Sequence, residues 1–549
     1  MPKIPFWVFI ILAVLYFTAI RVDTMDVDAS QYAEMSREMK QSGDYLHLYD
    51  RGHDYLDKPP FLFWASATSM RVFGDTNFGF KLPSILFALL ALFATYRLTR
   101  LLYNEDTARI AALVLGTSQG LFLMTNDVRC DTILMSWVIL AIWLIKEWQE
   151  NKKLYYLLLG AACVAGGMMT KGPIALMVPA FCFISDWVLK RQWKMFIRPQ
   201  YLLAIVVIGI LLIPMSIGLY QQFDLHPEKL IDGKYHTSGL RFFYWSQSFG
   251  RITGESPWSN GAGFDFLMSS MLWAYLPWIL LFLTGFITNV VRLVKQKIRL
   301  AYNEEWLSTG GFILTYCSLA SSHYQLPHYI FVAFPLASIV TGKYLYDLMN
   351  GRYPKMYRIL KPTQTTISAL LLVGALLTLT FVFPARPLVI VAWVGSAALW
   401  LYLAVSKKVT GKLVWISASA IMLANIFLTN HFYHSLLEYE VGAKVGRYID
   451  YRNIPANKIL SYRMQDELDA LPFYARRVIA KSDTPMVKLP AVQYVLTMDS
   501  GINDLHEKGY SFDTVKRSVL FKVSQLTPEF LNPATRSTAV HNYYFLRMK

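Results

Sequence analysis

The chain has 549 residues, of which 54% are hydrophobic and 16% are charged, and its formal net charge is +16. Soluble domains carry about 25% charged residues, so this composition and the long apolar runs exclude an ordinary soluble protein and indicate an integral membrane protein. The Lys and Arg residues lie in short loops between apolar runs. This is typical of cytoplasmic loops beside anionic membrane lipids, so we do not expect nucleic-acid binding.

Thirteen apolar segments approach the ~20 residues that a helix needs to cross a bilayer. They lie at residues 4–20, 80–98, 108–125, 131–145, 154–169, 172–189, 201–220, 264–291, 306–320, 328–349, 365–383, 387–405 and 413–430. No small-residue cleavage site follows the first segment, so we expect it to be retained as a span. A loop rich in Lys and Arg follows every even-numbered segment, which predicts a cytoplasmic N-terminus and a C-terminus on the outer side.

The loop at residues 23–79 is the most polar part of the first 434 residues and is predicted to lie on the outer face. Its charged residues include Asp23, Asp26, Asp28, Arg51, Asp54, Asp57 and Lys58. Helical periodicity predicts an amphipathic helix at residues 29–41, and Pro59-Pro60 predicts the start of a second helix at residues 61–73. Both helices are suited to lie in the membrane interface.

Two residues of this loop are candidates for chemistry on a lipid-borne sugar phosphate. Sugar transfer needs a base for the acceptor hydroxyl and a cation for the departing phosphate. Asp28 can supply the base and Lys58 the positive charge. Asp28 and Tyr32 share one face at the start of a helix. The alternative is an ordinary acidic loop in which Lys58 reaches lipid headgroups.

Asp131 begins the fourth apolar segment, directly after Asn126-Asp127-Val-Arg129-Cys. An ionisable residue at the membrane boundary is costly and is therefore a functional candidate. The alternatives are an ion pair between Arg129 and Asp131, or a carboxylate placed at a helix N-terminus by the helix dipole.

Arg251 lies in the long outer loop at residues 221–263 and can bind a phosphate bidentately, although a loop arginine is more often solvated.

His323 and His328 would suit a metal, but no third ligand follows in a nearby helical register. The cysteines Cys130, Cys163, Cys182 and Cys317 lie in or beside apolar runs, so we expect neither a disulfide framework nor a Cys-based metal site.

The composition changes from residue 435 onward. Short alternating runs at residues 458–463, 477–480, 492–497, 515–523 and 541–546 predict strands, and helical patterns lie at residues 465–475 and 501–509. The sequence therefore predicts a membrane domain at residues 1–434 and a small α/β domain at residues 435–549 on the outer face.

Several motifs, in fixed order and on the predicted outer face, resemble the bacterial aminoarabinose transferases that modify lipid A and, more widely, the protein O-mannosyltransferase superfamily of GT-C glycosyltransferases. They are Tyr32-Ala-Glu34-Met-Ser-Arg-Glu-Met, Ser42-Gly-Asp44, Asp57-Lys58-Pro59, Met169-Thr-Lys171-Gly172, Arg251 and Leu326-Pro327-His-Tyr329-Ile330. The resemblance implies a GT-C fold in a bacterial inner membrane, a polyprenyl (undecaprenyl) phosphate sugar donor, and an active site on the periplasmic face. The chain departs from the family pattern at Ala29, Gln31, His323 and Gln325, so the sugar and the acceptor stay open.

Together these observations predict an inverting glycosyltransferase whose acceptor is lipid A, another envelope glycan or, as the alternative, a protein Ser or Thr. The expected catalytic residues are Asp28 and Asp131, the expected phosphate ligands are Lys58, Arg251 and Tyr329, and the expected sugar or acceptor pocket residues are Tyr32 and Tyr55. Two cations can neutralise a monophosphate leaving group, so we expect no cofactor and no obligatory metal.

Two other classes of function remain. A lipid-sugar transporter would carry ionisable groups near the bilayer midplane, whereas the acidic groups here gather at one face. A membrane anchor for the C-terminal domain would make Asp28→Asn silent.

Overall fold

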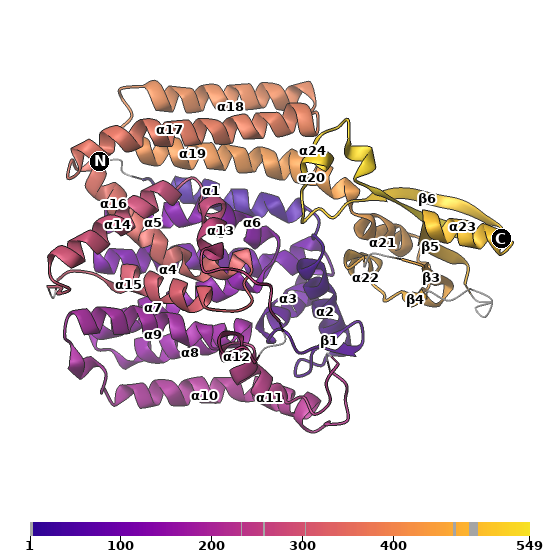
Figure 1. Ribbon diagram of the computed structural model, residues 1–549, viewed down its shortest axis with the longest axis horizontal. Helices are drawn as coiled ribbons and strands as arrows, with labels where there is room; N and C mark the ends of the chain where they lie inside the picture. Colours follow the sequence, from indigo (N-terminus) through magenta and orange to yellow (C-terminus); the bar gives the residue numbers. More distant parts are fainter. Residues whose placement is uncertain (1–3, 232, 256–257, 302, 465–467, 483–491) are drawn as a thin grey trace.

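The computed structural model describes residues 4–231, 233–255, 258–301, 303–464, 468–482 and 492–549. Long helices lie side by side and form one body, and a smaller α/β unit projects from one end of it (Figure 1). The N-terminus and the C-terminus lie at opposite ends of the molecule (Figure 1).

The helical body coincides with the predicted apolar segments. Its helices are α1 Trp7–Thr18, α4 Asn77–Leu102, α5 Glu105–Gly116, α6 Gln119–Asn126, α7 Cys130–Asn151, α8 Leu154–Lys171, α9 Ile174–Leu189, α10 Gln200–Leu219, α13 Phe266–Ala274, α14 Ile279–Lys295, α15 Leu307–Ala320, α16 Phe334–Met349, α17 Pro354–Leu377, α18 Pro387–Val405 and α19 Lys412–Phe427. Each predicted segment matches one of these helices or two helices in succession, counting the 3-10 helix η5 Pro327–Ala333 that precedes α16. Buried apolar side chains form one large cluster through the body.

Seven helical stretches of the described chain are long and apolar enough to cross a membrane, or eight if α5 and α6, which bend by 53°, form one span. In the most apolar window of α18, only 6% of the residues are buried inside the protein. Such a helix avoids exposing apolar side chains to water only if lipid surrounds it. The prediction of a helical, multi-span membrane protein is confirmed, and the number thirteen stays a prediction.

The first outer loop folds as two helices that lie between the body and the α/β unit (Figure 1). They are α2 Asp28–Ser42 and α3 Phe61–Phe73, which match the predicted helices to within one residue at each end. Gly43 ends α2 with a φ of 72°, which a residue without Cβ adopts at little cost. A short hairpin of β1 Tyr49–Asp50 and β2 His53–Asp54 connects the two helices.

The C-terminal unit is a five-stranded sheet with helices on both faces. Its elements are α20 Tyr433–Leu436, α21 Val441–Tyr451, β3 Ile459–Tyr462, α22 Ala470–Ala475, β4 Ala480–Ser482, β5 Tyr494–Met498, α23 Asp499–Glu507, β6 Phe512–Leu520, α24 Pro528–Leu531 and β7 His541–Met548. The strand order is β4-β3-β5-β7-β6, with β3 parallel to β4 and β5, and with β7 antiparallel to β5 and β6. Alternate side chains of the strands face α21 and α22 on one side and α23 on the other.

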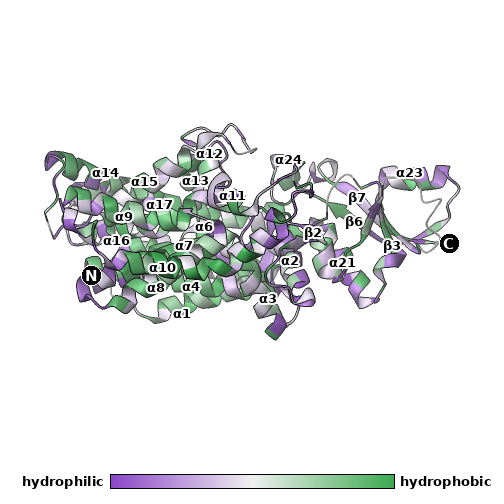
Figure 2. Ribbon diagram, turned by 90° about the horizontal axis from the view of Figure 1, so that it is seen from below, coloured by the Kyte–Doolittle hydropathy of each residue, from purple (hydrophilic) through white to green (hydrophobic). Residues whose placement is uncertain are grey.

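All five predicted strands of this unit have a counterpart, although the run at residues 477–480 overlaps β4 only at its last residue. The predicted helix at residues 465–475 is represented by α22, and its residues 465–467 lie outside the described residues. The predicted division at residues 434 and 435 falls within α20 and stays a prediction. Hydropathy separates the two parts, because apolar residues dominate the helical body while polar residues are frequent in the α/β unit (Figure 2).

The packing of α16 on α5 gives a stability prediction. A Cβ added to Gly342 would lie 2.9 Å from the backbone nitrogen of Ala111, whereas nothing lies within 4 Å of a Cβ at Gly374. We expect Gly342→Ala to lower the melting temperature in detergent, because overpacking costs about 1–3 kcal/mol. The matched change Gly374→Ala should be neutral or stabilising, since alanine favours a helix over glycine by about 1 kcal/mol. Equal melting temperatures for the two variants would contradict the packing described.

Candidate active site

Three segments that are distant in sequence bring Lys58, Arg251 and Tyr329 together at the end of the body that faces the α/β unit. Lys58 lies in the turn before α3, where Pro59 and Pro60 prevent any earlier helix. Arg251 lies in α12 Phe249–Thr253. Tyr329 lies in η5, which begins at a proline.

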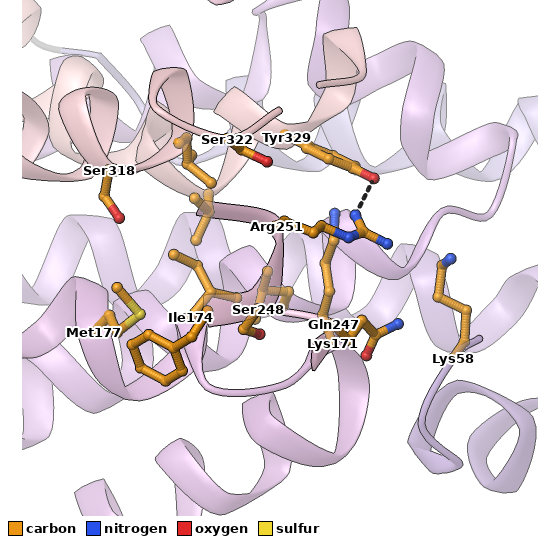
Figure 3. A pocket seen from close by; sticks show the side chains of 14 residues that line it. Lys58, Lys171, Ile174, Met177, Gln247, Ser248, Arg251, Ser318, Ser322 and Tyr329 are labelled. Carbon is orange, nitrogen blue, oxygen red and sulfur yellow. Dashed lines mark hydrogen bonds between the residues drawn. The ribbon is translucent and has the colours of Figure 1, made fainter. Parts of the chain in front are cut away.

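Arg251 is only 9% exposed, and its Nη1 donates a hydrogen bond of 2.9 Å to the hydroxyl of Tyr329 (Figure 3). Its guanidinium carbon lies 5.1 Å from the ring centroid of Trp258 and 5.4 Å from that of Tyr324. Among the described residues, Arg251 forms no ion pair with a carboxylate, and its buried Nε has no hydrogen-bond acceptor. A buried cation without a direct ion-pair partner is costly, so this position is suited to bind an anion.

Lys58 forms an ion pair with its neighbour Asp57. Burial raises the pKa of Asp57, but Lys58 and then Arg251 outweigh this effect, and the net pKa lies below its ordinary value. Burial lowers the pKa of Lys58, and Asp57 reverses that shift, so the net pKa is raised. Both groups are therefore charged at neutral pH, and Figure 3 shows Lys58 on the same cavity as Arg251.

Lys171 adds a third cation beneath Tyr329. It is the last residue of α8, and Gly172 then adopts a φ of 108° before Pro173 starts α9, a turn that strongly favours glycine. The Nζ of Lys171 lies 3.9 Å from the centroid of the Tyr329 ring and 2.5 Å from Oδ1 of Asp131.

Asp131 lies in the first turn of α7, directly after Cys130, and is 2% exposed. Its Oδ2 lies 3.7 Å from Nε2 of His328, while Oδ1 binds Lys171. Asp131 is not among the residues that line the two cavities described next. The sequence predicts a catalytic role for Asp131; the structure places its carboxylate against Lys171, and the catalytic role stays a prediction. Arg129 and Asp131 do not form the ion pair that the sequence allows as an alternative; no such pair occurs among the described residues.

Two cavities of opposite character meet at Lys58, Arg251 and Tyr329, which line both of them. The first has a volume of about 80 Å³ and a largely apolar wall (Figure 3). Its apolar lining residues are Leu134, Ile174, Met177, Phe249, Leu319 and Val332. The second cavity is mainly polar, has a volume of about 510 Å³, and is lined by residues of the first outer loop and of the long outer loop.

Asp28 lines the polar cavity. It is the first residue of α2, and its carboxylate forms an ion pair with Arg129, which also donates a hydrogen bond of 2.6 Å to Asp127. The side chain of Asp28 is 38% exposed, compared with 15% for Arg129. Arg129 therefore compensates the charge of a carboxylate that stays accessible from the cavity.

The two tyrosines predicted to shape the sugar pocket differ in position. Tyr55 lines the polar cavity. Tyr32 is 3% exposed and packs edge-to-face on Phe63, with ring centroids 5.7 Å apart. Tyr32 therefore lies in the apolar cluster between α2 and α3 and not on the lining of either cavity, because α3 covers this part of α2.

Two glutamines fasten the segment that carries Lys58 to the long outer loop. Gln222 exchanges hydrogen bonds with the backbone of Leu48, at 3.0 and 2.7 Å, and donates one of 2.8 Å to Asp54. Gln247 donates to the backbone carbonyl of Asp57. Sequence reasoning did not single out these glutamines, because nothing in a linear sequence marks a loop glutamine as a connector.

No group of three or more His, Cys, Asp or Glu side chains in the described part of the chain is arranged to hold a metal ion. His323 donates its backbone N–H to the carbonyl of Arg251 at 3.0 Å and so helps to fix the arginine.

Comparisons with known proteins find similar chains. A family model described as dolichyl-phosphate-mannose-protein mannosyltransferase matches residues 57–217. The chain is 25% identical over 389 residues to undecaprenyl phosphate-alpha-4-amino-4-deoxy-L-arabinose arabinosyl transferase 1 of Pseudomonas fluorescens (strain Pf0-1), covering 68% of this chain and 64% of that protein. It is 28% identical over 340 residues to the transferase of Yersinia enterocolitica, covering 60% and 57%. The chain thus spans less than two thirds of the length of these relatives.

The fold resembles the crystal structure of ArnT from Cupriavidus metallidurans bound to undecaprenyl phosphate, with a TM-score of 0.73, 17% identity and coverage of 98% of both chains. The TM-score against the same protein in the apo state is 0.72. The chain therefore has the fold of this transferase. The resemblance to the aminoarabinose transferases that the sequence motifs indicate is confirmed.

The pair of Asp131 and Lys171 gives a prediction at the base of the site. Asp131→Asn removes one partner from a buried ion pair and leaves Lys171 charged, which costs about 3–5 kcal/mol. We expect a marked fall in melting temperature in detergent. The control is Asp513→Asn, because Asp513 is 65% exposed and pairs with Lys549 at 2.7 Å on the surface. An exposed pair contributes about 0–1 kcal/mol, so equal destabilisation in the two variants would argue against a structural role for Asp131.

Proposed function

We propose that the protein is an integral-membrane glycosyltransferase that moves a sugar from a polyprenyl phosphate carrier to an acceptor, with inversion at the anomeric carbon. One observation carries the proposal: a buried arginine that forms no ion pair with a carboxylate of the described residues lies where an apolar cavity meets a polar one. A polyprenyl phosphate sugar has the same three parts, with its anion between an apolar chain and a polar sugar.

In this proposal the carrier phosphate binds Lys58 and Arg251 and accepts a hydrogen bond from Tyr329. The first isoprene units enter the apolar cavity beside α7, α9 and α15, and the sugar enters the polar cavity, where Tyr55 contacts it. Two relatives are named for an undecaprenyl phosphate sugar, which supports a carrier of this class.

Asp28 accepts the proton of the acceptor hydroxyl as that oxygen attacks the anomeric carbon. The bond between that carbon and the phosphate oxygen breaks, and its electron pair stays with the polyprenyl phosphate. Lys58 and Arg251 neutralise the charge that develops on this leaving group, and their fixed positions avoid the reorganisation that water would need. Attack from the side opposite the phosphate inverts the configuration. We propose that Asp131 holds Lys171 beneath Tyr329. This positioning role takes the place of direct catalysis by Asp131.

The proposed topology has thirteen spans, with the N-terminus in the cytoplasm and the site and the α/β unit in the periplasm of a bacterial inner membrane. The interfacial placement of α2 and α3 is part of this proposal. It rests on the loops rich in Lys and Arg that alternate along the chain.

We propose lipid A or another envelope glycan as the acceptor. A protein Ser or Thr is the second candidate, because the matching family model is described as a protein mannosyltransferase. Purified protein in vesicles with a labelled polyprenyl phosphate sugar, offered lipid A or envelope protein, distinguishes the two by the product that carries the label. Movement of the labelled lipid across the bilayer without any acceptor modification would favour a transporter.

The phosphate site predicts a defect in donor binding. Arg251→Ala should weaken the binding of polyprenyl phosphate by a factor of about 10–150, because a hydrogen bond to a charged group contributes about 1.5–3 kcal/mol. Thermal shift and direct binding in detergent measure this effect. Arg241→Ala is the matched control, since Arg241 belongs to the same outer loop but is 71% exposed. Unchanged donor binding together with weaker acceptor binding would overturn this assignment.

The proposed base predicts a defect in turnover. Asp28→Asn keeps the shape of the side chain but removes its basicity, so we expect kcat to fall by about 10²–10⁴ while polyprenyl phosphate binding is retained. Asp54→Asn is the comparison, because Asp54 lines the same cavity but its two oxygens bind Gln222 at 2.8 Å and Lys229 at 2.9 Å. Near-normal turnover in Asp28→Asn would show that another group accepts the proton.

A further inference from the structure

The α/β unit holds the short segment that leads into Asp28. The backbone N–H of Thr24 donates a hydrogen bond of 2.8 Å to the hydroxyl of Tyr474, which lies on α22. The backbone N–H of Asp26 donates one of 3.0 Å to Oε1 of Glu440, the residue before α21. Two backbone groups within four residues of Asp28 thus bind side chains that are more than 400 positions away in the sequence.

Further contacts fix the same junction. Arg447 of α21 forms an ion pair with Asp23, and its guanidinium carbon lies 4.6 Å from the ring centroid of Tyr474. The hydroxyl of Tyr474 donates to Asn77 at 2.7 Å, and Asn77 donates to Asp23 at 3.0 Å. The segment is therefore held through its backbone and through a side chain.

The same unit also holds the rest of the first outer loop. Asp469 forms an ion pair with Arg51, which lies in the hairpin between β1 and β2. Arg37, on the buried side of α2, donates a hydrogen bond of 3.1 Å to the backbone carbonyl of Arg476. The segment before α2, the body of α2 and the hairpin after it are thus all attached to the α/β unit.

Glu440 accepts this hydrogen bond from a buried position. It is 1% exposed, and its Oε2 has no hydrogen-bond partner among the described residues. Burial, and next the carboxylate of Asp26, raises the pKa of Glu440 well above its usual range. Burial raises the pKa of Asp26 to about 7. A glutamine can accept the same hydrogen bond, so the conservative variant Glu440→Gln should preserve the contact.

We propose that Glu440 and Tyr474 are positioning residues of the active site, which act through the backbone of Asp26 and Thr24 to fix the carboxylate of Asp28. Neither residue is among those that line the two cavities, so neither contacts the substrate. The inference rests on the proposed function, because it assigns the α/β unit a role in the same transfer reaction. A displacement of about 1 Å in a catalytic group can lower the rate about 10²-fold.

The test compares Glu440→Ala, Glu440→Gln and Tyr474→Phe in the full-length protein, in detergent or vesicles. We expect kcat to fall by about 10- to 100-fold in Glu440→Ala and Tyr474→Phe, with KM for the donor and binding of polyprenyl phosphate unchanged. Glu440→Gln should return kcat to the wild-type range. Hydrogen exchange of residues 22–30 should become faster in the two impaired variants. The controls are Glu507→Ala at the end of α23 and Tyr451→Phe, whose side chain is 84% exposed.

The outcomes separate this inference from the proposed function. If the wild-type protein transfers sugar and both impaired variants keep wild-type kcat, the inference is wrong and the proposed function stands. Unchanged hydrogen exchange at residues 22–30 would also overturn it. If Glu440→Ala fails to fold, Tyr474→Phe carries the test. If the wild-type protein transfers no sugar but still binds polyprenyl phosphate, the proposed function fails, and the exchange measurement still decides whether these side chains hold the segment.

Discussion

The guanidinium of Arg251 is buried, and no carboxylate among the described residues forms an ion pair with it. Burying a charge without a direct ion-pair partner is costly, and stacking on Trp258 and Tyr324 offsets only part of this cost. The hydroxyl of Tyr329 is a neutral acceptor, and the buried Nε is left without one. An anion at this position would satisfy both the charge and the donor. An apolar cavity lies on one side of this position and a polar cavity on the other. The anion that fits is therefore one that links a lipid chain to a polar group.

Contacts from other parts of the molecule hold Lys58, Arg251 and Tyr329 in position. Loops that meet at one end of the helical body bring Lys58, Arg251 and Tyr329 together, and hydrogen bonds from Gln222 and Gln247 tie two of those loops to each other. Beneath Tyr329, Asp131 forms an ion pair with Lys171 and so fixes the position of this cation. The α/β unit contacts the segment before α2, which begins with Asp28, and contacts Arg37 within that helix. In the proposed catalytic centre these contacts tie the first outer loop to the long outer loop and to the α/β unit.

Much of the fold could be predicted from the sequence, because the strongest signals are local. Apolar runs predict the positions of the helices, and Pro59-Pro60 predicts the start of α3. Alternation of apolar and polar residues predicts the strands of the C-terminal unit. The roles of individual carboxylates were harder to predict. Asp131 has the features of a catalytic residue in sequence, yet its partner Lys171 lies 40 positions away and only the fold shows that the two neutralise each other. Tyr32 has the right spacing from Asp28, but burial of that helix face depends on α3. The partners of Asp26 and Thr24 lie in another part of the chain, and no periodicity encodes such contacts.

The central claim is that the junction of the two cavities binds the phosphate of a polyprenyl carrier. The most direct test is an experimental structure of the protein with polyprenyl phosphate bound. The account predicts phosphate density within hydrogen-bonding distance of Lys58 and Arg251, with the isoprene chain leaving through the apolar cavity beside α7 and α9. Phosphate bound instead at the opposite end of the helical body, for example beside Arg292 and Lys343 in the cavity between α14 and α16, with the Arg251 site empty, would contradict it.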